Sequence, residues 1–103
     1  MKLSVEQKDS GIVILRFSED LNYQQAALIR EKLDEVCKEK PGAILIDLRN
    51  VPYLDSSAIA AFVELSQKTR ALQAKLIFFG LTDSVREIFE MAKLHLFFTI
   101  AAT

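Results

Sequence analysis

Residues 43–70 read AILIDLRNVPYLDSSAIAAFVELSQKTR, and this stretch decides the fold. It begins with a short, continuous apolar run over residues 43–46, which predicts a strand covered on both faces. A short loop follows, and apolar residues then recur at helical spacing from about Ser56 to Leu72. The stretch therefore predicts a buried strand that leads through a loop into an amphipathic helix.

The flanking sequence extends this unit into a small α/β domain. Two runs of alternating apolar residues are separated by the turn sequence KDSG, which is typical of a β-hairpin. A capping box formed by Ser84 and Glu87 predicts a third helix. The expected strands are residues 3–7, 12–17, 43–46, 76–79 and 96–100, and the expected helices are residues 24–38, 56–72 and one starting near Ser84. Because two buried strands joined by a helix form a right-handed βαβ unit, we expect a single α/β domain over residues 1–103, with a mixed central sheet and helices packed on it.

Composition narrows the classes of function. The chain has 103 residues, 50% of them hydrophobic, and a formal net charge of −1 with Lys and Arg scattered, so we expect no direct contact with nucleic acid. No apolar run approaches the roughly 20 residues of a membrane helix, so we expect no direct membrane insertion. A lone cysteine, Cys37, and an N-terminus without the apolar core of a signal peptide favour a cytoplasmic protein. No glycine-rich motif follows a strand, so nothing in the sequence is suited to hold a nucleotide phosphate, and we expect no cofactor in this chain.

Asp55, Ser56 and Ser57 stand where the loop meets the predicted helix. The first N–H groups of a helix have no partner within it, so this position suits either a capping side chain or a phosphate group. The loop also follows the end of a central strand, where open α/β sheets commonly place their contact sites. Of Tyr53 and Leu54, we expect one side chain to anchor the loop in the core and the other to face a partner.

The same stretch resembles a known family. ILIDLRNVPYLDSSAIAAF is similar to the signature of the STAS domain, named for sulfate transporters and anti-sigma factor antagonists, in which a strand leads through a short loop to Asp-Ser-Ser/Thr-Gly and a helix. EDLNYQQAALIREKL lies where the family has Gly-Glu-Leu-Asp and a helix. KLIFFGLTDSVREIFEMAKLHLFFTI resembles the later strand, helix and closing segment. The resemblance covers nearly the whole chain.

This resemblance implies a binding switch rather than an enzyme. In the bacterial antagonists, the first serine after the aspartate is phosphorylated by an anti-sigma factor that is also a serine kinase. The unphosphorylated form binds that partner, the phosphorylated form releases it, and a serine phosphatase resets this partner-switching cycle of transcription control. The matching phosphorylation site is Ser56, with Asp55 orienting the loop and Ser57 capping the helix. The expected partner-binding residues are Asn22, Tyr53, Asp55, Ser57 and Ala58.

Three departures from the family pattern motivate an alternative. Ala58 replaces the glycine after the serine pair, Glu19 and Asn22 replace the glycine and aspartate of Gly-Glu-Leu-Asp, and family members often continue past the position of Thr103 into another helix. The alternative is a constitutive, unphosphorylated STAS subunit docked on a membrane transport complex. Asn22 is still expected to cap the first helix.

A third hypothesis is a serine hydrolase that uses Ser56, His95 and Asp55 as a triad. His95 is the only histidine, so the sequence offers no multi-histidine metal site, and we expect this residue at the surface or at a sheet edge. Nothing in the sequence fixes the oligomeric state.

Overall fold

β3 (Ala43–Asn50) lies in the middle of a five-stranded sheet in the computed structural model, which describes residues 2–8 and 10–101. The strand order is β1-β2-β3-β4-β5, with β1 and β2 antiparallel and all other neighbours parallel. The other strands are β1 (Lys2–Lys8), β2 (Ile12–Ser18), β4 (Lys75–Phe79) and β5 (Thr99–Ile100). The helices are α1 (Ala26–Lys38), α2 (Ser56–Ala71), α3 (Asp83–Met91) and the short 3-10 helix η1 (Leu94–Leu96). The predicted α/β class with a mixed central sheet is confirmed, while Asp9 of the expected turn lies outside the described residues.

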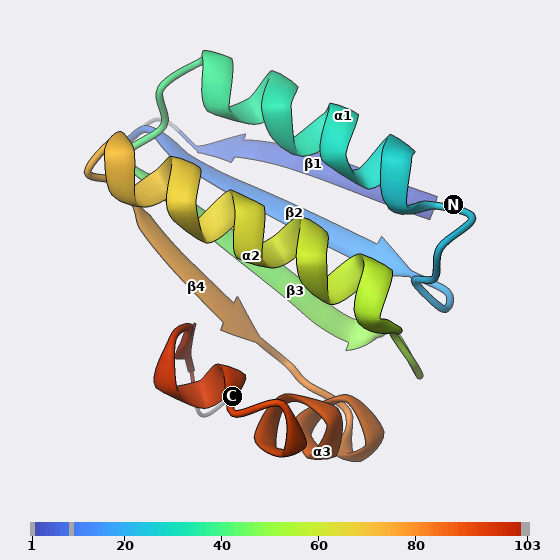
Figure 1. The fold of residues 1–103 in the computed structure, drawn as a ribbon. Helices are drawn as coiled ribbons and strands as arrows, with labels where there is room; N and C mark the ends of the chain where they lie inside the picture. The colour runs from blue at the N-terminus through green and yellow to red at the C-terminus, as the bar shows by residue number, and fades with distance from the viewer. Residues whose placement is uncertain (1, 9, 102–103) are drawn as a thin grey trace.

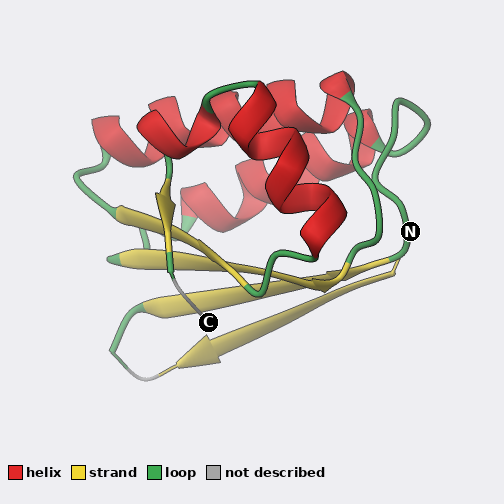
Figure 2. Ribbon diagram, turned by 90° about the horizontal axis from the view of Figure 1, so that it is seen from below, coloured by secondary structure: helices red, strands yellow, loops and turns green. Residues whose placement is uncertain are grey.

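The helices all lie on one side of the sheet (Figure 2). α1 and α2 run side by side across this face, and α3 lies beyond the end of β4 (Figure 1). A row of phenylalanines joins the layers, each ring packed edge to face on the next at centroid distances of 5.3–5.9 Å. The row consists of Phe17, Phe62, Phe78 and Phe89. Because α2 supplies the second ring between those of β2 and β4, this packing fixes α2 over the middle of the sheet.

The opposite face of the sheet carries no helix in the part of the chain that the structure describes (Figure 2). The prediction that the central strands are covered on both faces is therefore wrong. Side chains alternate along β3, so Leu45 points away from the helices and yet is half-buried. Its neighbours in register are Ile14 on β2 and Ile77 on β4, which shield it from the sides. Here a continuous apolar run marks apolar neighbours within the sheet rather than a second helical layer.

Two predicted features near the C-terminus also need correction. α3 is capped by Thr82 rather than Ser84: the Thr82 hydroxyl accepts a hydrogen bond from the backbone N–H of Val85 at 3.3 Å and donates to the carbonyl of Val51 at 3.1 Å. Because Thr82 also binds Val51, which is distant in sequence, Thr82 caps α3 in place of Ser84 of the predicted capping box. The strand expected over 96–100 shortens to β5, because Leu96 ends η1 and residues 97–98 form a turn.

Asp47 of β3 lies on the open face but is only 2% exposed. The guanidinium of Arg49 donates to both of its carboxylate oxygens at 2.8–3.2 Å, and the backbone N–H of Arg49 donates at 3.0 Å. Nε of Arg16 lies 3.4 Å from the same carboxylate. Burial acts to raise the pKa of Asp47, but the hydrogen bonds from Arg49 and the charges of both arginines outweigh burial and hold the pKa below its usual value.

Gly80 makes room for this arginine. Its backbone has φ +72°, and a Cβ added there would lie 2.1 Å from Cγ of Arg49. The guanidinium of Arg49 also lies over the ring of Phe79, 5.8 Å from its centroid. Glycine at this position therefore allows Arg49 to cross the chain and cover Asp47.

We expect Gly80→Ala to lower the free energy of unfolding by about 1–3 kcal/mol, because the positive φ and the displacement of Arg49 act together. Urea unfolding followed by circular dichroism measures the change. Gly42→Ala is the matched control, since its added Cβ would meet only Gly11 O at 3.9 Å, and we expect its effect to stay within about 0.5 kcal/mol. Equal losses in the two variants would contradict the importance of the contact with Arg49.

Asp47 also predicts a dependence of stability on pH. The pKa of its carboxyl is lower in the folded protein than the ordinary value of 3.8, so its ionised form contributes stability above pH 3.8. That contribution is lost as the pH falls through the folded pKa. Asp47→Asn should be less stable than the wild type at neutral pH, and the difference should shrink in acid. Thermal unfolding of both proteins across a pH series tests this, and a difference that stays constant would refute it.

Candidate functional site

The carboxylate of Asp55 caps α2. Asp55 has extended backbone angles (φ −105°, ψ −177°), and its Oδ1 accepts hydrogen bonds from the backbone N–H groups of Ser57 at 3.0 Å and Ala58 at 3.1 Å. The prediction that Ser57 caps the helix is therefore wrong, because the N–H of Ser57 is itself one of the capped groups. The candidate phosphorylation site, Ser56, becomes the first residue of α2.

The other carboxylate oxygen of Asp55 binds a second loop. Oδ2 accepts a hydrogen bond from the backbone N–H of Tyr23 at 2.9 Å. Beside it, Leu21 and Leu54 form an isolated parallel bridge, in which the N–H of Leu21 donates to the carbonyl of Tyr53 and the N–H of Asp55 donates to the carbonyl of Leu21, both at 3.0 Å. The β2–α1 loop (residues 19–25) and the β3–α2 loop (residues 51–55) are thus joined directly.

Two positions in the β2–α1 loop, Glu19 and Asn22, are those at which the sequence departs from the Gly-Glu-Leu-Asp pattern that the resemblance implies. Glu19 has φ +93°, a conformation that favours glycine, and its N–H donates to the carbonyl of Asn50 at 3.1 Å. Asn22 does not cap α1, because that helix begins after Gln25. Instead Oδ1 of Asn22 accepts a hydrogen bond from the N–H of Gln24 at 2.9 Å, within the turn before the helix. Asn22 thereby shapes the loop that Asp55 holds.

The two halves of the candidate site differ in exposure. Leu54 is 1% exposed and anchors the β3–α2 loop, whereas Tyr53 is 50% exposed, as the sequence predicts for this pair. Ser56 is exposed and Ser57 is half-buried. Ala58 is completely buried, so its methyl group faces the core and is not available to contact a partner.

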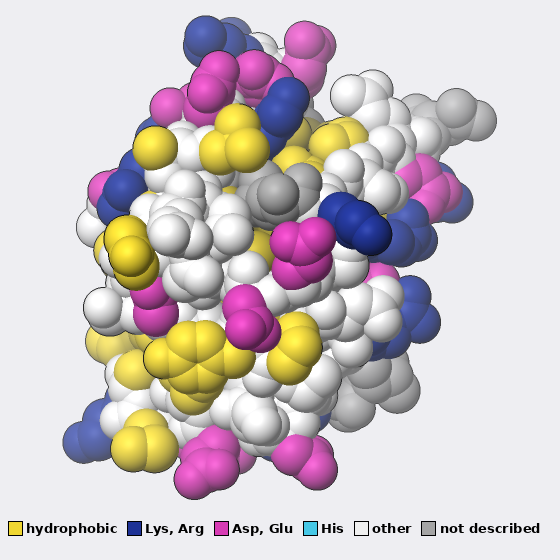
Figure 3. Space-filling view, turned by 90° about the vertical axis from the view of Figure 1, so that its right-hand side faces the viewer, with side chains coloured by type: hydrophobic (Ala, Val, Ile, Leu, Met, Phe, Trp, Pro, Cys, Tyr) yellow, Lys and Arg dark blue, Asp and Glu magenta, His cyan; other side chains and the backbone are white. Residues whose placement is uncertain are grey.

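The surface around the start of α2 combines hydrophobic and acidic groups. Figure 3 shows the end of the molecule where β2 and β3 finish, with hydrophobic side chains set among several acidic ones. Tyr53 and Tyr23, which is 70% exposed, come from the two joined loops. Such a surface suits contact with another protein better than binding of a free anion.

The arrangement does not support a hydrolytic triad. The Asp55 carboxylate is engaged by three backbone N–H groups. His95 lies in η1 and lines a separate cavity of about 420 Å³, which is bordered by residues of α3 and of the C-terminal segment and does not include Ser56. No group of three or more metal-ligating side chains occurs among residues 2–8 and 10–101.

Comparison with known proteins identifies the family. Residues 4–103 match the profile of the STAS domain. The chain belongs to the STAS domain family. The anti-sigma-B factor antagonist of Listeria monocytogenes is 30% identical over 95 residues, which cover 91% of this chain and 82% of that protein.

Solved structures share the STAS fold. An anti-sigma factor antagonist from Mycobacterium paratuberculosis has a TM-score of 0.89 at 20% identity, covering 99% of this chain and 86% of its own. The Bacillus protein SpoIIAA in its phosphorylated form has a TM-score of 0.76 at 17% identity, covering 98% and 92%. None of the helices described for this STAS domain is both long and apolar enough to cross a membrane.

Sequence reasoning named Asn22 of the β2–α1 loop but missed Leu21 and Tyr23, the residues that join this loop to the STAS site. Leu21 and Tyr23 take part through backbone groups, and Leu21 is completely buried. Backbone contacts leave little trace in a single sequence. An apolar residue within the polar run before α1 was the one available signal, and Leu21 is that residue.

We expect Asp55→Ala to lower the free energy of unfolding by about 1–2 kcal/mol, because it removes the helix cap and the bond to Tyr23 together. Ser57→Ala is the matched control, since it keeps the backbone N–H that Asp55 binds, and its effect should stay within about 0.5 kcal/mol. Denaturant unfolding measures both. A larger loss from Ser57→Ala than from Asp55→Ala would show that the serine hydroxyl is the cap.

Proposed function

We propose that this STAS domain is an anti-sigma factor antagonist controlled by phosphorylation of Ser56. The observation that carries the proposal is the division of roles at the start of α2: Asp55 caps the helix, and the neighbouring hydroxyl of Ser56 is exposed. A protein kinase can therefore reach Ser56 without disturbing the cap. The similarity to the antagonist from Listeria supports the same function.

The partner is an anti-sigma factor that is also a serine kinase, and it binds the unphosphorylated form. Tyr53 and Tyr23 flank Ser56 from the two joined loops and supply exposed aromatic surface of the kind that forms the centre of protein interfaces. The kinase brings ATP and Mg²⁺, a serine phosphatase resets the cycle, and the exchange takes place in the cytoplasm. The chain itself needs no catalytic group.

Electrostatics explain how one phosphate switches binding. A phosphate on Ser56 adds a charge of about −1.5 to −2 at the helix N-terminus. The helix end favours this charge by about 0.3–1 kcal/mol, and little more is available because Asp55 already binds the N–H groups of Ser57 and Ala58. An interface closing over the phosphate beside Asp55 must desolvate two negative groups, which costs several kcal/mol without a cationic partner.

These magnitudes predict a change in binding with little change in folding. A loss of about 4 kcal/mol in binding free energy lowers the affinity for the partner about a thousandfold. The stabilisation of the phosphate by the N-terminus of α2 is at most about 1 kcal/mol. Phosphorylation should therefore release the partner and leave the domain folded. This separation is what a reversible switch requires.

We expect Ser56→Glu to weaken binding to the cognate anti-sigma factor by at least about tenfold and to shift the melting temperature by only a few degrees. Ser56→Ala should bind like the wild type and should take up no phosphate. Titration calorimetry with the purified partner measures affinity. Ser57→Ala serves as the control for position, because incubation of this variant with the kinase and ATP should still yield phosphate on Ser56.

Intact-mass analysis of the protein from its own host gives the first test. A single phosphate on Ser56 whose occupancy changes with growth or stress supports the switch. If Ser56 stays unmodified in every condition and Ser56→Glu binds the partner like the wild type, the proposal fails. The constitutive subunit of a transport complex then becomes the better hypothesis.

A further inference from the structure

β1 is an open edge of the sheet. It pairs with β2 through an uninterrupted antiparallel register from Lys2↔Ser18 to Lys8↔Ile12, and no other described strand lies beside its outer side. Edge strands are usually kept short, bent, interrupted by proline or charged, because their free N–H and C=O groups can pair with another chain. Of these devices β1 has only charged side chains, those of Lys2, Glu6 and Lys8. β1 has seven residues and neither proline nor a bulge, whereas the opposite edge, β5, has two residues.

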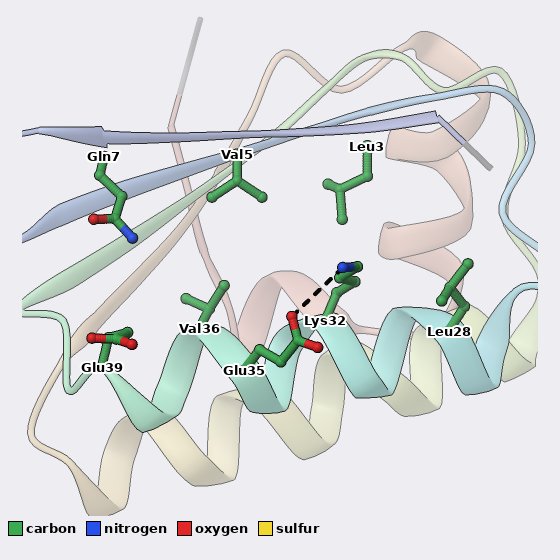
Figure 4. Close-up of a pocket in the computed structure, with 8 residues that line it drawn as sticks. All are labelled: Leu3, Val5, Gln7, Leu28, Lys32, Glu35, Val36 and Glu39. Carbon is green, nitrogen blue, oxygen red and sulfur yellow. Dashed lines mark ion pairs between the residues drawn. The ribbon is translucent and has the colours of Figure 1, made fainter.

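An apolar groove runs along this edge. It has a volume of about 390 Å³ and lies between β1 and α1 (Figure 4). Val5 and Leu28 are 48% and 42% exposed, and Leu3 and Val36 are half-buried beside them. Lys32 and Glu35, both on α1, form an ion pair of 3.6 Å along the helix side of the groove. The free backbone and the apolar side chains therefore occur together.

We propose that this edge binds a second copy of this chain: β1 pairs antiparallel with β1 of the second copy about a two-fold axis at Ser4, and the two sheets become continuous. The charges select this register. With Ser4 on the axis, Lys2 lies opposite Glu6 of the second copy, twice, and Leu3 lies opposite Val5 of the second copy. Glu6 already pairs with Lys8 and Arg16 of its own copy, so Lys2 adds a further opposite charge to this cluster. With Val5 on the axis, Lys2 would lie opposite Lys8 of the second copy, which is unfavourable.

The groove between β1 and α1 is also compatible with a two-fold axis at Ser4. Figure 4 places Leu3 and Leu28 at one end of the groove, Val5 and Val36 farther along, and Gln7 with Glu39 at the other end. The two-fold axis reverses this order in the second copy. It brings the half of α1 that holds Lys32 toward the half that holds Glu35 of the second copy, so each charge gains a second neighbour of opposite sign besides its partner within the helix. The surface is self-complementary in apolar and charged groups alike.

The dimer leaves the Ser56 site free. Ser56 follows β3, which is separated from the β1 edge by β2, so self-association and partner exchange use different surfaces. The interface joins a single strand and one helix face on each copy, which places it among small, weak interfaces. We therefore expect a reversible dimer that forms at high concentration.

Cysteine cross-linking tests the register directly. In a Cys37→Ala background, Ser4→Cys should form a disulfide-linked dimer on mild oxidation, because facing residues on the axis lie about 4.5–5.5 Å apart between Cα atoms, within the range of a disulfide. Ser10→Cys is the matched control: Ser10 is exposed but lies in the hairpin turn away from the edge, and it should remain monomeric under the same conditions. Equal cross-linking of the two variants, or cross-linking of Val5→Cys in preference to Ser4→Cys, would overturn the proposal.

The mass of the protein in solution provides the second readout. Light scattering coupled to size exclusion should show the mass of the wild type rising from monomer toward dimer as the protein concentration is raised to about 1 mM. Val5→Glu should be monomeric with unchanged circular dichroism, since Val5 is half exposed, and Lys2→Glu should raise the dissociation constant about five- to tenfold. A wild-type protein that stays monomeric over this range, or a dimer unaffected by Val5→Glu, refutes the interface. Neither result depends on phosphorylation of Ser56.

Discussion

The carboxylate of Asp55 is the contact on which the arrangement of the site depends. One oxygen accepts the first free N–H groups of α2, and the other accepts the N–H of Tyr23 from the β2–α1 loop. A single side chain therefore fixes both the start of the helix and the position of the loop beside it. The buried bridge between Leu21 and Leu54 holds the same two loops from the core side. Ser56 is presented on a frame that is fixed on both sides.

This arrangement separates stability from regulation. The groups that stabilise the start of α2 are Asp55, which caps it, and Ala58, which is completely buried. Ser56, between them, is exposed and can change its charge without removing any of these contacts. The Asp55 cap also uses N–H groups that a phosphate would otherwise bind. The helix therefore stabilises the phosphorylated form only through its dipole, by about 1 kcal/mol at most. A modification that is nearly neutral for folding can act mainly on binding.

The sequence predicts the central unit because its signals are local. Apolar spacing identifies β3 and α2, and the turn-flanked alternation identifies the hairpin of β1 and β2. Features that depend on distant contacts are predicted less well. Thr82 becomes a helix cap because it also binds the carbonyl of Val51, and Asp47 is buried because Arg49 crosses Gly80 to cover it. The same limit applies at the site, where Tyr23 contributes a backbone N–H and no recognisable side-chain chemistry.

Glu19 shows how firmly the two loops are held. A residue with a Cβ costs on the order of 1 kcal/mol in the left-handed region, yet Glu19 keeps φ +93°. The chain can accept this cost only if the surrounding contacts together exceed it. Three backbone hydrogen bonds surround Glu19, from Glu19 to Asn50, from Leu21 to Tyr53 and from Asp55 to Leu21. A fourth hydrogen bond runs from the N–H of Tyr23 to the Asp55 carboxylate. At about 0.5–1.5 kcal/mol each, they outweigh the strain. The replacement of glycine by Glu19 therefore changes the charge of this loop while its backbone remains in the conformation that positions Ser56.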